Sequence, residues 1–246
     1  MNRVLNVSLN YFRQGERFSF SDWTVLEKAW LVVSTIMITV ASVLTWDTTN
    51  NIASVVALIS SITGMWCVVF AAKGKLANYY FGLINVVFYA TAAFMWKLYG
   101  DFMLNTFYFL PMQFYGWYKW IQQGNNKGST VSHVLSSKSR LLWGIITVVA
   151  TVAYGMVLSA MGGITPYLDS ASTVFSVISM ILMAKSYAEQ WVLWVVVDIV
   201  TVIMWANICF NEGGMMNFGL LIMWVLWLIN AVYGLYNWMK MSRGVK

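Results

Sequence analysis

Hydrophobic positions along this chain gather into long runs that are separated by short polar stretches. Crossing the hydrocarbon core of a bilayer takes roughly 20 apolar residues in a helix, and most of the runs reach that length. Helices satisfy their own backbone hydrogen bonds in lipid, whereas the strands of a β-barrel alternate apolar and polar residues over about ten positions. The eight predicted spans are Ala29–Trp46, Ile52–Ala72, Leu76–Trp96, Phe102–Ile121, Leu141–Met161, Ala171–Ala184, Trp191–Phe210 and Met215–Met239.

Composition supports a membrane protein. Hydrophobic residues make up 60% of the chain and charged residues 10%, against about 45–50% and about 25% in soluble domains. The first run follows 28 polar and mixed residues, which is too long for the charged start of a typical signal peptide. We expect residues 1–28 to form an interfacial or loosely ordered tail. The sequence thus predicts an all-α integral membrane protein with eight transmembrane helices.

Basic residues indicate the orientation of these helices. Of the 15 Lys and Arg residues, all except Lys97 fall in the two terminal segments, in alternate loops or, for Lys119, at the end of a span beside such a loop. Cytoplasmic loops carry the excess of Lys and Arg in membrane proteins, so the pattern places both termini in the cytoplasm and favours an even number of spans. The net charge of +6 is spread too thinly to predict nucleic-acid binding.

Comparison of the sequence with itself indicates an internal repeat with three predicted helices in each unit; the alternative is chance similarity among apolar runs. A unit with an odd number of spans can repeat in the same orientation only if an extra span separates the two copies, and the fifth run supplies that span. Corresponding positions have the same offset at both ends of the units and a slightly smaller one in the middle: Ala53 pairs with Ala171, Tyr115 with Tyr233, and Asn85 with Asp198.

The repeat divides the chain into six parts. Two parallel three-helix bundles, related by an axis along the membrane normal, place a substrate site between them in some secondary transporters. We expect the same arrangement here. The predicted parts are a tail (1–28), an N-terminal helix (29–46), bundle 1 (50–121), a cytoplasmic loop (122–139), a linker helix (140–161) and bundle 2 (169–240).

Asp198 is the acidic residue that lies well inside a predicted span. A charged Asp at a helix centre costs roughly 2.5–3.5 kcal/mol on insertion scales, so its side chain should face protein or a watery cavity. It is a candidate contact for a substrate or a cation; the alternatives are a structural hydrogen bond or a protonated carboxyl group. Thr201 and Trp205 share its helical face, and Asn207 lies roughly on that side.

The span Phe102–Ile121 carries two amides and two aromatic rings at a spacing of four residues. Amides donate and accept hydrogen bonds, and rings offer flat surfaces for stacking, so this stripe is a candidate binding face; the alternative is ordinary packing. Pro111 interrupts the helix and is expected to kink it. The stripe consists of Asn105, Phe109, Gln113 and Trp117, and weaker candidates elsewhere are Asn85, Trp224 and Asn230.

Several enzyme classes are excluded by missing motifs. The chain has no phosphate-binding GxxxxGK[ST] loop and a single histidine, His133, so a Ser/His/Asp triad is impossible. Its two cysteines, Cys67 and Cys209, lie inside apolar runs and predict neither a disulfide nor a metal cluster. We therefore expect transport rather than catalysis, with no cofactor and no metal.

Two segments of the sequence resemble the PnuC family of bacterial nicotinamide riboside transporters. They are FGLINVVFYATAAFMWKLYGDFMLNTFYFLPMQFYGWYKW and WVVVDIVTVIMWANICFNEGGMMNFGLLIMWVLWLINAVYGLYNWMK, and the resemblance covers about residues 50–240. It implies an inner-membrane transporter related in architecture to the SWEET sugar transporters, and a homotrimer. It also implies facilitated diffusion of the riboside, which a cytoplasmic kinase then traps by phosphorylation.

The resemblance also implies a set of substrate contacts. Nicotinamide riboside has a flat cationic ring, a carboxamide and ribose hydroxyls, which suit Trp faces, amides and a carboxylate. A proton-coupled transporter of another small vitamin or nucleoside, with Asp198 as the carrier, stays open, as does a receptor or scaffold without transport. The matching positions are Asn105, Gln113, Trp117, Trp194, Asp198, Thr201 and Asn207.

Overall fold

A computed structural model describes residues 20–46, 48–95, 102–123, 129–162, 166–211 and 218–244. These residues form helices and contain no β-strand, only two isolated bridges. Each of the eight predicted spans corresponds to helical structure. In chain order the elements are α2 (Val25–Leu44), α3 (Asn51–Ala72), α4 (Ala77–Met95), the π-helix η2 (Leu104–Phe109), α6 (Leu110–Gln123), α7 (Ser137–Ala160), α8 (Pro166–Ala184), α9 (Gln190–Asn211) and α10 (Phe218–Arg243).

Three helices, α2, α7 and α8, begin earlier than the hydrophobic pattern predicts, because a capping residue or a proline opens them. Ser136 caps α7, and its side chain accepts from the Ser139 amide. Thr24 caps α2 in a capping box with Glu27, a pairing that satisfies two backbone donors at the helix start. Helix α8 begins at Pro166, whose fixed φ and missing N–H suit the first helical position. The described end of the predicted tail is also packed: Trp23 is 5% exposed and stacks edge-on against Phe20.

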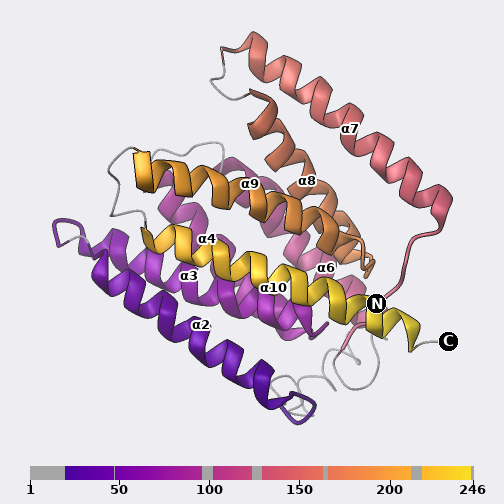
Figure 1. Cartoon of the computed structure of the whole chain (residues 1–246), viewed down its shortest axis with the longest axis horizontal. Helices are drawn as coiled ribbons and strands as arrows, with labels where there is room; N and C mark the ends of the chain where they lie inside the picture. The colour runs from indigo at the N-terminus through magenta and orange to yellow at the C-terminus, as the bar shows by residue number, and fades with distance from the viewer. Residues whose placement is uncertain are drawn as a thin grey trace.

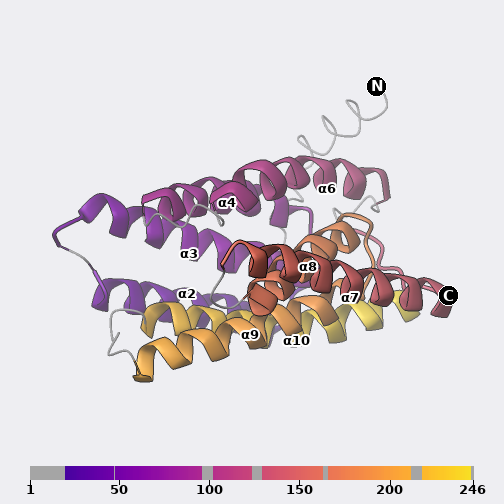
Figure 2. The ribbon, with the colours of Figure 1, turned by 90° about the horizontal axis from the view of Figure 1, so that it is seen from above.

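Six helices form a closed ring. Each packs against the next in the order α3, α4, α6, α8, α9, α10 and back to α3. Outside the ring, α2 packs against α3 and α10, and α7 packs against α8, so that α7 stands at the edge of the molecule (Figure 1). Figure 2 shows α4 and α6 in one layer and α2, α9 and α10 in the other. The ring thus joins the unit α3–α6 to the unit α8–α10, here called the first and second units.

The two units make matching contacts at one end of the ring, here called the shared end. The indole N–H of Trp120 donates to the carbonyl of Met183 at 2.8 Å, and that of Trp238 donates to the carbonyl of Ala71 at 2.9 Å. The two tryptophans occupy the same place in the repeat, and each carbonyl belongs to the penultimate residue of a first helix. Each unit therefore caps the first helix of the other. Such contacts are what the predicted parallel repeat would produce.

The segment that follows α6 closes this end by binding both units. The turns after α3 and α8 each contain a residue with positive φ, Gly74 at 65° and Ser186 at 60°. The amide of Thr130 donates to the Gly74 carbonyl, and the amide of His133 donates to the Ser186 carbonyl, both at 2.8 Å. The described chain before α7 is therefore an ordered strap across the two turns.

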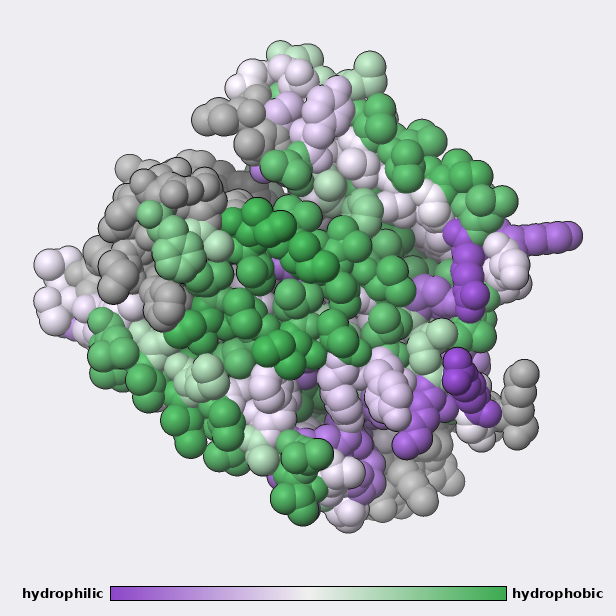
Figure 3. Space-filling model, in the orientation of Figure 1, coloured by the Kyte–Doolittle hydropathy of each residue, from purple (hydrophilic) through white to green (hydrophobic). Residues whose placement is uncertain are grey.

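The surface of the helices suits a bilayer. Five helices, namely α2, α3, α7, α8 and residues Leu221–Arg243 of α10, are each long and apolar enough to cross a membrane by themselves. Hydrophobic side chains cover the face seen in Figure 3, and hydrophilic ones gather at its shared end. The described lysines on the turns and helix ends there include Lys73, Lys75, Lys119, Lys185 and Lys240. The chain is an all-α, multi-pass membrane protein.

Candidate substrate site

Gln113 is the most constrained polar residue of the predicted stripe. Its side chain is 6% exposed and lies on α6 against the backbone of α4: a Cβ added to Gly82 would come within 2.6 Å of Oε1. Only glycine leaves room for the amide at that point. Oε1 is buried and accepts no hydrogen bond from the described residues. An unmade hydrogen bond on a buried group costs about 1–3 kcal/mol, so this acceptor is poised for a ligand or a water molecule.

The helix that carries Gln113 is not regular, which the four-residue spacing did not predict. The turns from Leu104 to Phe109 form a π-helix, in which the N–H of Leu110 donates to the carbonyl of Asn105 five residues back. Pro111 follows at once, and proline has no N–H to continue an α-helical ladder. The extra residue in the turn rotates Asn105 relative to Gln113. Both side chains are nevertheless buried.

Asp198 lies on α9 in the second unit and is 4% exposed. No residue in the described ranges forms a hydrogen bond or an ion pair with its carboxyl group. Thr201, three residues later, is also buried, and its hydroxyl donates to the Val197 carbonyl at 2.8 Å within the helix. Trp194, one turn before Asp198, packs against the core cluster described next.

A core cluster at the shared end brings aromatic candidates from both units together. All six ring helices contribute residues to it, and Phe109, Trp117 and Trp194 pack against it. The ring of Tyr80 stands edge-on to that of Trp117, with their centres 5.2 Å apart. The indole N–H of Trp117 is buried and donates to no described residue. The stripe on α6 and the Asp198 face of α9 therefore approach one aromatic centre from opposite units.

The weaker candidates form a separate group around α3. The amide of Asn85 donates to the Ser60 carbonyl at 2.8 Å, and that of Asn230 donates to the Val68 carbonyl at 2.9 Å. Trp224 packs edge-on against Trp227 with ring centres 4.9 Å apart. The two amide contacts hold α4 and α10 to α3. A structural role for both amides was not evident from the sequence, which gives no pairing partner.

Two candidates cannot be placed. The side chains of Trp205 and Asn207 lie outside the described part of α9, as does that of Cys209. Cys67 is described and has a free thiol.

The structure adds two buried polar atoms that sequence reasoning missed. The hydroxyl of Tyr79 and the indole N–H of Trp191 have no described hydrogen-bond partner. Both residues lie in the first turn of the second helix of their unit. Tyr79 lies against Gly116, and Trp191 lies against Gly234, with space for no Cβ in either place. The recurrence of this glycine in both copies of the repeat was the available signal, because small residues allow close helix contacts.

Asp198 is the buried acidic residue on the α9 side of the site. A second carboxylate lies beside the aromatic cluster: Glu27 accepts from the hydroxyl of Tyr233, which packs against the cluster, and pairs with Lys73. The described residues contain no group of three His, Cys, Asp or Glu that could hold a metal ion. This arrangement suits a ligand that is neutral or cationic, flat and able to hydrogen-bond, and it disfavours an anion.

Comparison with known proteins connects this geometry to a family. Residues 54–240 match the family model described as nicotinamide mononucleotide transporter. The chain is 36% identical to the nicotinamide riboside transporter PnuC of Neisseria mucosa, over 93% of this chain and 86% of that protein. It is 33% identical to the protein of the same name from Haemophilus influenzae, over 91% of this chain and 93% of that protein.

A solved structure is similar along nearly the whole fold. It is described as the crystal structure of the vitamin B3 transporter PnuC, with a TM-score of 0.77 and 36% identity. The match covers 92% of this chain and 96% of the solved chain. The similar proteins are named as transporters, in agreement with the expectation of transport rather than catalysis.

Proposed function

The chain belongs to the PnuC family of nicotinamide mononucleotide transporter proteins, and from that premise we propose that it carries nicotinamide riboside across the bacterial inner membrane. The observation that carries the proposal is the set of buried groups without described partners inside the ring. Gln113 and Trp117 supply them from the first unit. From the second unit comes Asp198, which is 4% exposed and whose carboxyl group has no hydrogen bond or ion pair from the described residues. Such groups cost stability unless a ligand or water satisfies them.

Each part of nicotinamide riboside has a counterpart among these residues. Trp117 and Trp194 offer rings for the flat cationic pyridinium, since aromatic faces attract cations. The Gln113 and Asn105 amides can pair with the carboxamide, because both groups donate and accept. The Asp198 carboxylate can accept from ribose hydroxyls and offset the positive charge. Thr201 and Asn207 complete the proposed set on α9.

The charge of the site favours the riboside over its phosphorylated form. The family model carries the name of the mononucleotide, whereas the relatives above are named for the riboside. A phosphate buried near Asp198 would meet a like charge. Burying an unpaired charge is costly. We therefore assign the riboside as the substrate.

Transport is proposed to proceed by facilitated diffusion, with one unit rocking against the other. An inside-negative potential of 100 mV favours entry of one positive charge by about 2.3 kcal/mol, so no coupled ion is needed. With both termini in the cytoplasm, the shared end faces the compartment in which a kinase phosphorylates the riboside. We propose a homotrimer as the assembled form.

The second candidate function is proton-coupled transport, and the unpaired Asp198 carboxyl favours it. A carboxyl group that binds and releases a proton during each cycle would need no permanent partner. A receptor or scaffold without transport is the third possibility. Uptake of labelled nicotinamide riboside into proteoliposomes separates the three.

The uptake experiment uses one matched pair of variants on α6. Gln113→Ala removes the buried amide, and Gln122→Ala removes an exposed amide from the same helix. We expect uptake without a pH gradient, reduced roughly tenfold in Gln113→Ala because leaving a buried hydrogen-bonding group without its partner costs about 1–3 kcal/mol, and unchanged in Gln122→Ala. Uptake only with a proton gradient would select the coupled mechanism, and binding without uptake would select the receptor.

A further inference from the structure

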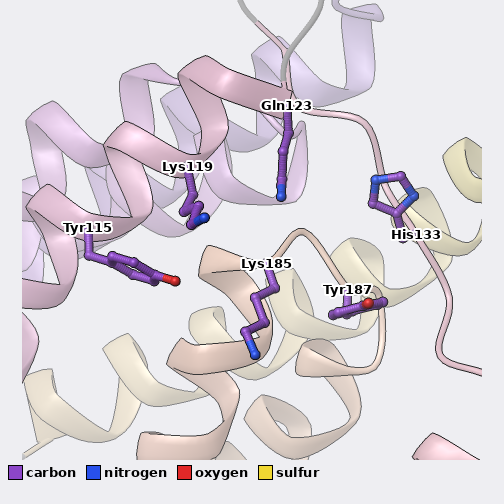
Figure 4. A pocket seen from close by; sticks show the side chains of 6 residues that line it. All are labelled: Tyr115, Lys119, Gln123, His133, Lys185 and Tyr187. Carbon is purple, nitrogen blue, oxygen red and sulfur yellow. The ribbon is translucent and has the colours of Figure 1, made fainter. Parts of the chain in front are cut away.

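A pocket of about 420 Å³ lies outside the substrate site, where α6 and α8 end at the shared end. Figure 4 shows the side chains around it, with Lys119 on α6 and Lys185 in the turn after α8. The remaining residues come from α6, from the strap and from the turn after α8. The lining consists of Tyr115, Lys119, Gln123, His133, Lys185 and Tyr187.

The pocket is rich in positive charge, and no carboxylate lines it. Neither Lys119 nor Lys185 forms an ion pair with a described acidic residue. Each ammonium group instead stands over an aromatic ring, Lys119 at 5.8 Å from the centre of Tyr115 and Lys185 at 5.9 Å from that of Trp143. Glu189, two residues after Tyr187, pairs through Oε1 with Arg140 at 2.8 Å, and its Oε2 is buried without a described partner. Two lysines thus line one opening, and neither is paired with a described acidic residue.

The other unit shows what the counterpart residues bind. Lys73 and Lys185 each follow the last residue of a first helix, and Tyr115 and Tyr233 occupy the same place in the repeat. Lys73 Nζ pairs with the carboxylate of Glu27 at 2.8 Å, and the Tyr233 hydroxyl donates to the same carboxylate. At this edge of the ring, where α3 meets α10, helix α2 packs against both and supplies Glu27. At the α6–α8 edge no described segment supplies such an anion.

We propose that the pocket formed by α6, α8 and the strap binds a phosphate group. Asn237 stands at the position that corresponds to Lys119, and it binds the Ala72 carbonyl at 2.7 Å, so the open pocket has one cation more than its filled counterpart. A phosphate carries more charge and more acceptor oxygens than a carboxylate. Basic pockets between transmembrane helices bind lipid headgroups. The phosphate can belong to an anionic lipid or to a soluble phosphate.

The experiment compares the full-length protein with two variants in detergent. The double variant Lys119→Gln, Lys185→Gln removes both cations, and Lys240→Gln removes one exposed lysine from the same end outside the pocket. Native mass spectrometry measures retention of phosphatidylglycerol against phosphatidylcholine. Thermal unfolding with and without inorganic phosphate tests the soluble source. Unliganded unfolding temperatures report whether each variant folds.

We expect phosphatidylglycerol or inorganic phosphate to bind the wild type, with affinity lowered about fivefold for each lysine removed and unchanged in Lys240→Gln. If the double variant loses the phosphatidylglycerol adduct that the wild type retains, the phosphate belongs to a lipid. If the double variant loses the rise in unfolding temperature that inorganic phosphate gives the wild type, the phosphate is soluble. The proposal is overturned if neither probe binds, or if the folded double variant binds as the wild type does. Should the double variant not fold, the single variants Lys119→Gln and Lys185→Gln decide by the same criteria.

Discussion

The two units of the ring are built alike at the shared end and differ where a polar side chain sits within a membrane span. Trp120 and Trp238 cap the first helix of the opposite unit through corresponding carbonyls. Asn85 and Asp198 also correspond in the repeat, yet Asn85 is bonded to Ser60, whereas Asp198 has no bond from the described residues. The contacts that both units share thus hold the ring together. The position at which the two units differ, Asn85 against Asp198, is where a polar group is left available for function.

The largest expected effect separates Asp198 from Asn85. Asp198→Asn should lower nicotinamide riboside affinity roughly 10- to 100-fold, since hydrogen bonds to charged groups contribute about 1.5–3 kcal/mol. It should not lower the unfolding temperature, because no described contact is lost. Asn85→Ala should do the reverse, destabilising the protein while leaving affinity within a few-fold. Titration calorimetry and thermal unfolding of both variants test the contrast, which fails if the two variants behave alike.

The next effect tests the close helix contacts that both units share. A Cβ at Gly116 would lie 2.5 Å from the Tyr79 hydroxyl, and one at Gly234 would lie 2.7 Å from the Trp191 ring. Gly116→Ala and Gly234→Ala should each destabilise the protein by about 1–3 kcal/mol, the usual cost of overpacking. Gly144→Ala on α7 meets no atom within 4 Å and is the control. Equal unfolding temperatures for all three would refute the packing explanation.

A smaller effect tests the equality of the two capping tryptophans. Trp120→Phe and Trp238→Phe each leave one carbonyl without its indole donor, at a cost of about 0.6–1.7 kcal/mol for polar contacts between membrane helices. The two losses in unfolding temperature should be similar, because the contacts correspond. Trp46→Phe, which loses an exposed bond to Asn51, should have less effect. A large inequality between Trp120 and Trp238 would show that the shared end is not balanced between the units.

The smallest effect concerns the ion pair that fills one edge of the ring. The side chains of Glu27 and Lys73 are each 12% exposed. Their pairing should therefore contribute about 1 kcal/mol to stability, the upper end of the range for exposed pairs. Glu27→Gln should lower the unfolding temperature slightly at low salt and less at high salt, because ions screen the attraction that is lost. Glu189→Gln, which breaks the more exposed pair with Arg140, is the comparison.

Much of the fold followed from patterns within the sequence. The eight hydrophobic runs predicted helical structure in each place, because burial in lipid demands both apolar side chains and internal hydrogen bonds. The starts of α2, α7 and α8 were less predictable, since Thr24, Ser136 and Pro166 open the helices before their apolar runs begin. The π-helical turn before Pro111 was also missed, because spacing by four residues assumes a regular helix.

The candidate site divides in the same way. The sequence identified Gln113 and Asp198 as polar groups in apolar surroundings, and the structure describes both as buried. It could not tell them from Asn85 and Asn230, whose donors are used by carbonyls of α3. A polar side chain in apolar surroundings needs a hydrogen-bond partner, but only the packing of another helix decides whether that partner is present.

By itself, the sequence determined the membrane class, the helices and the inventory of scarce polar groups, because these depend on local composition and on the cost of burying charge. The tertiary structure decided which groups are paired. It also closed six helices into a ring in which the contact between α3 and α10 differs from the contact between α6 and α8. The carboxylate of Glu27 fills one edge, and the corresponding lysine at the other edge, Lys185, lines an open pocket. These outcomes depend on contacts between residues far apart in the chain, which no local pattern specifies.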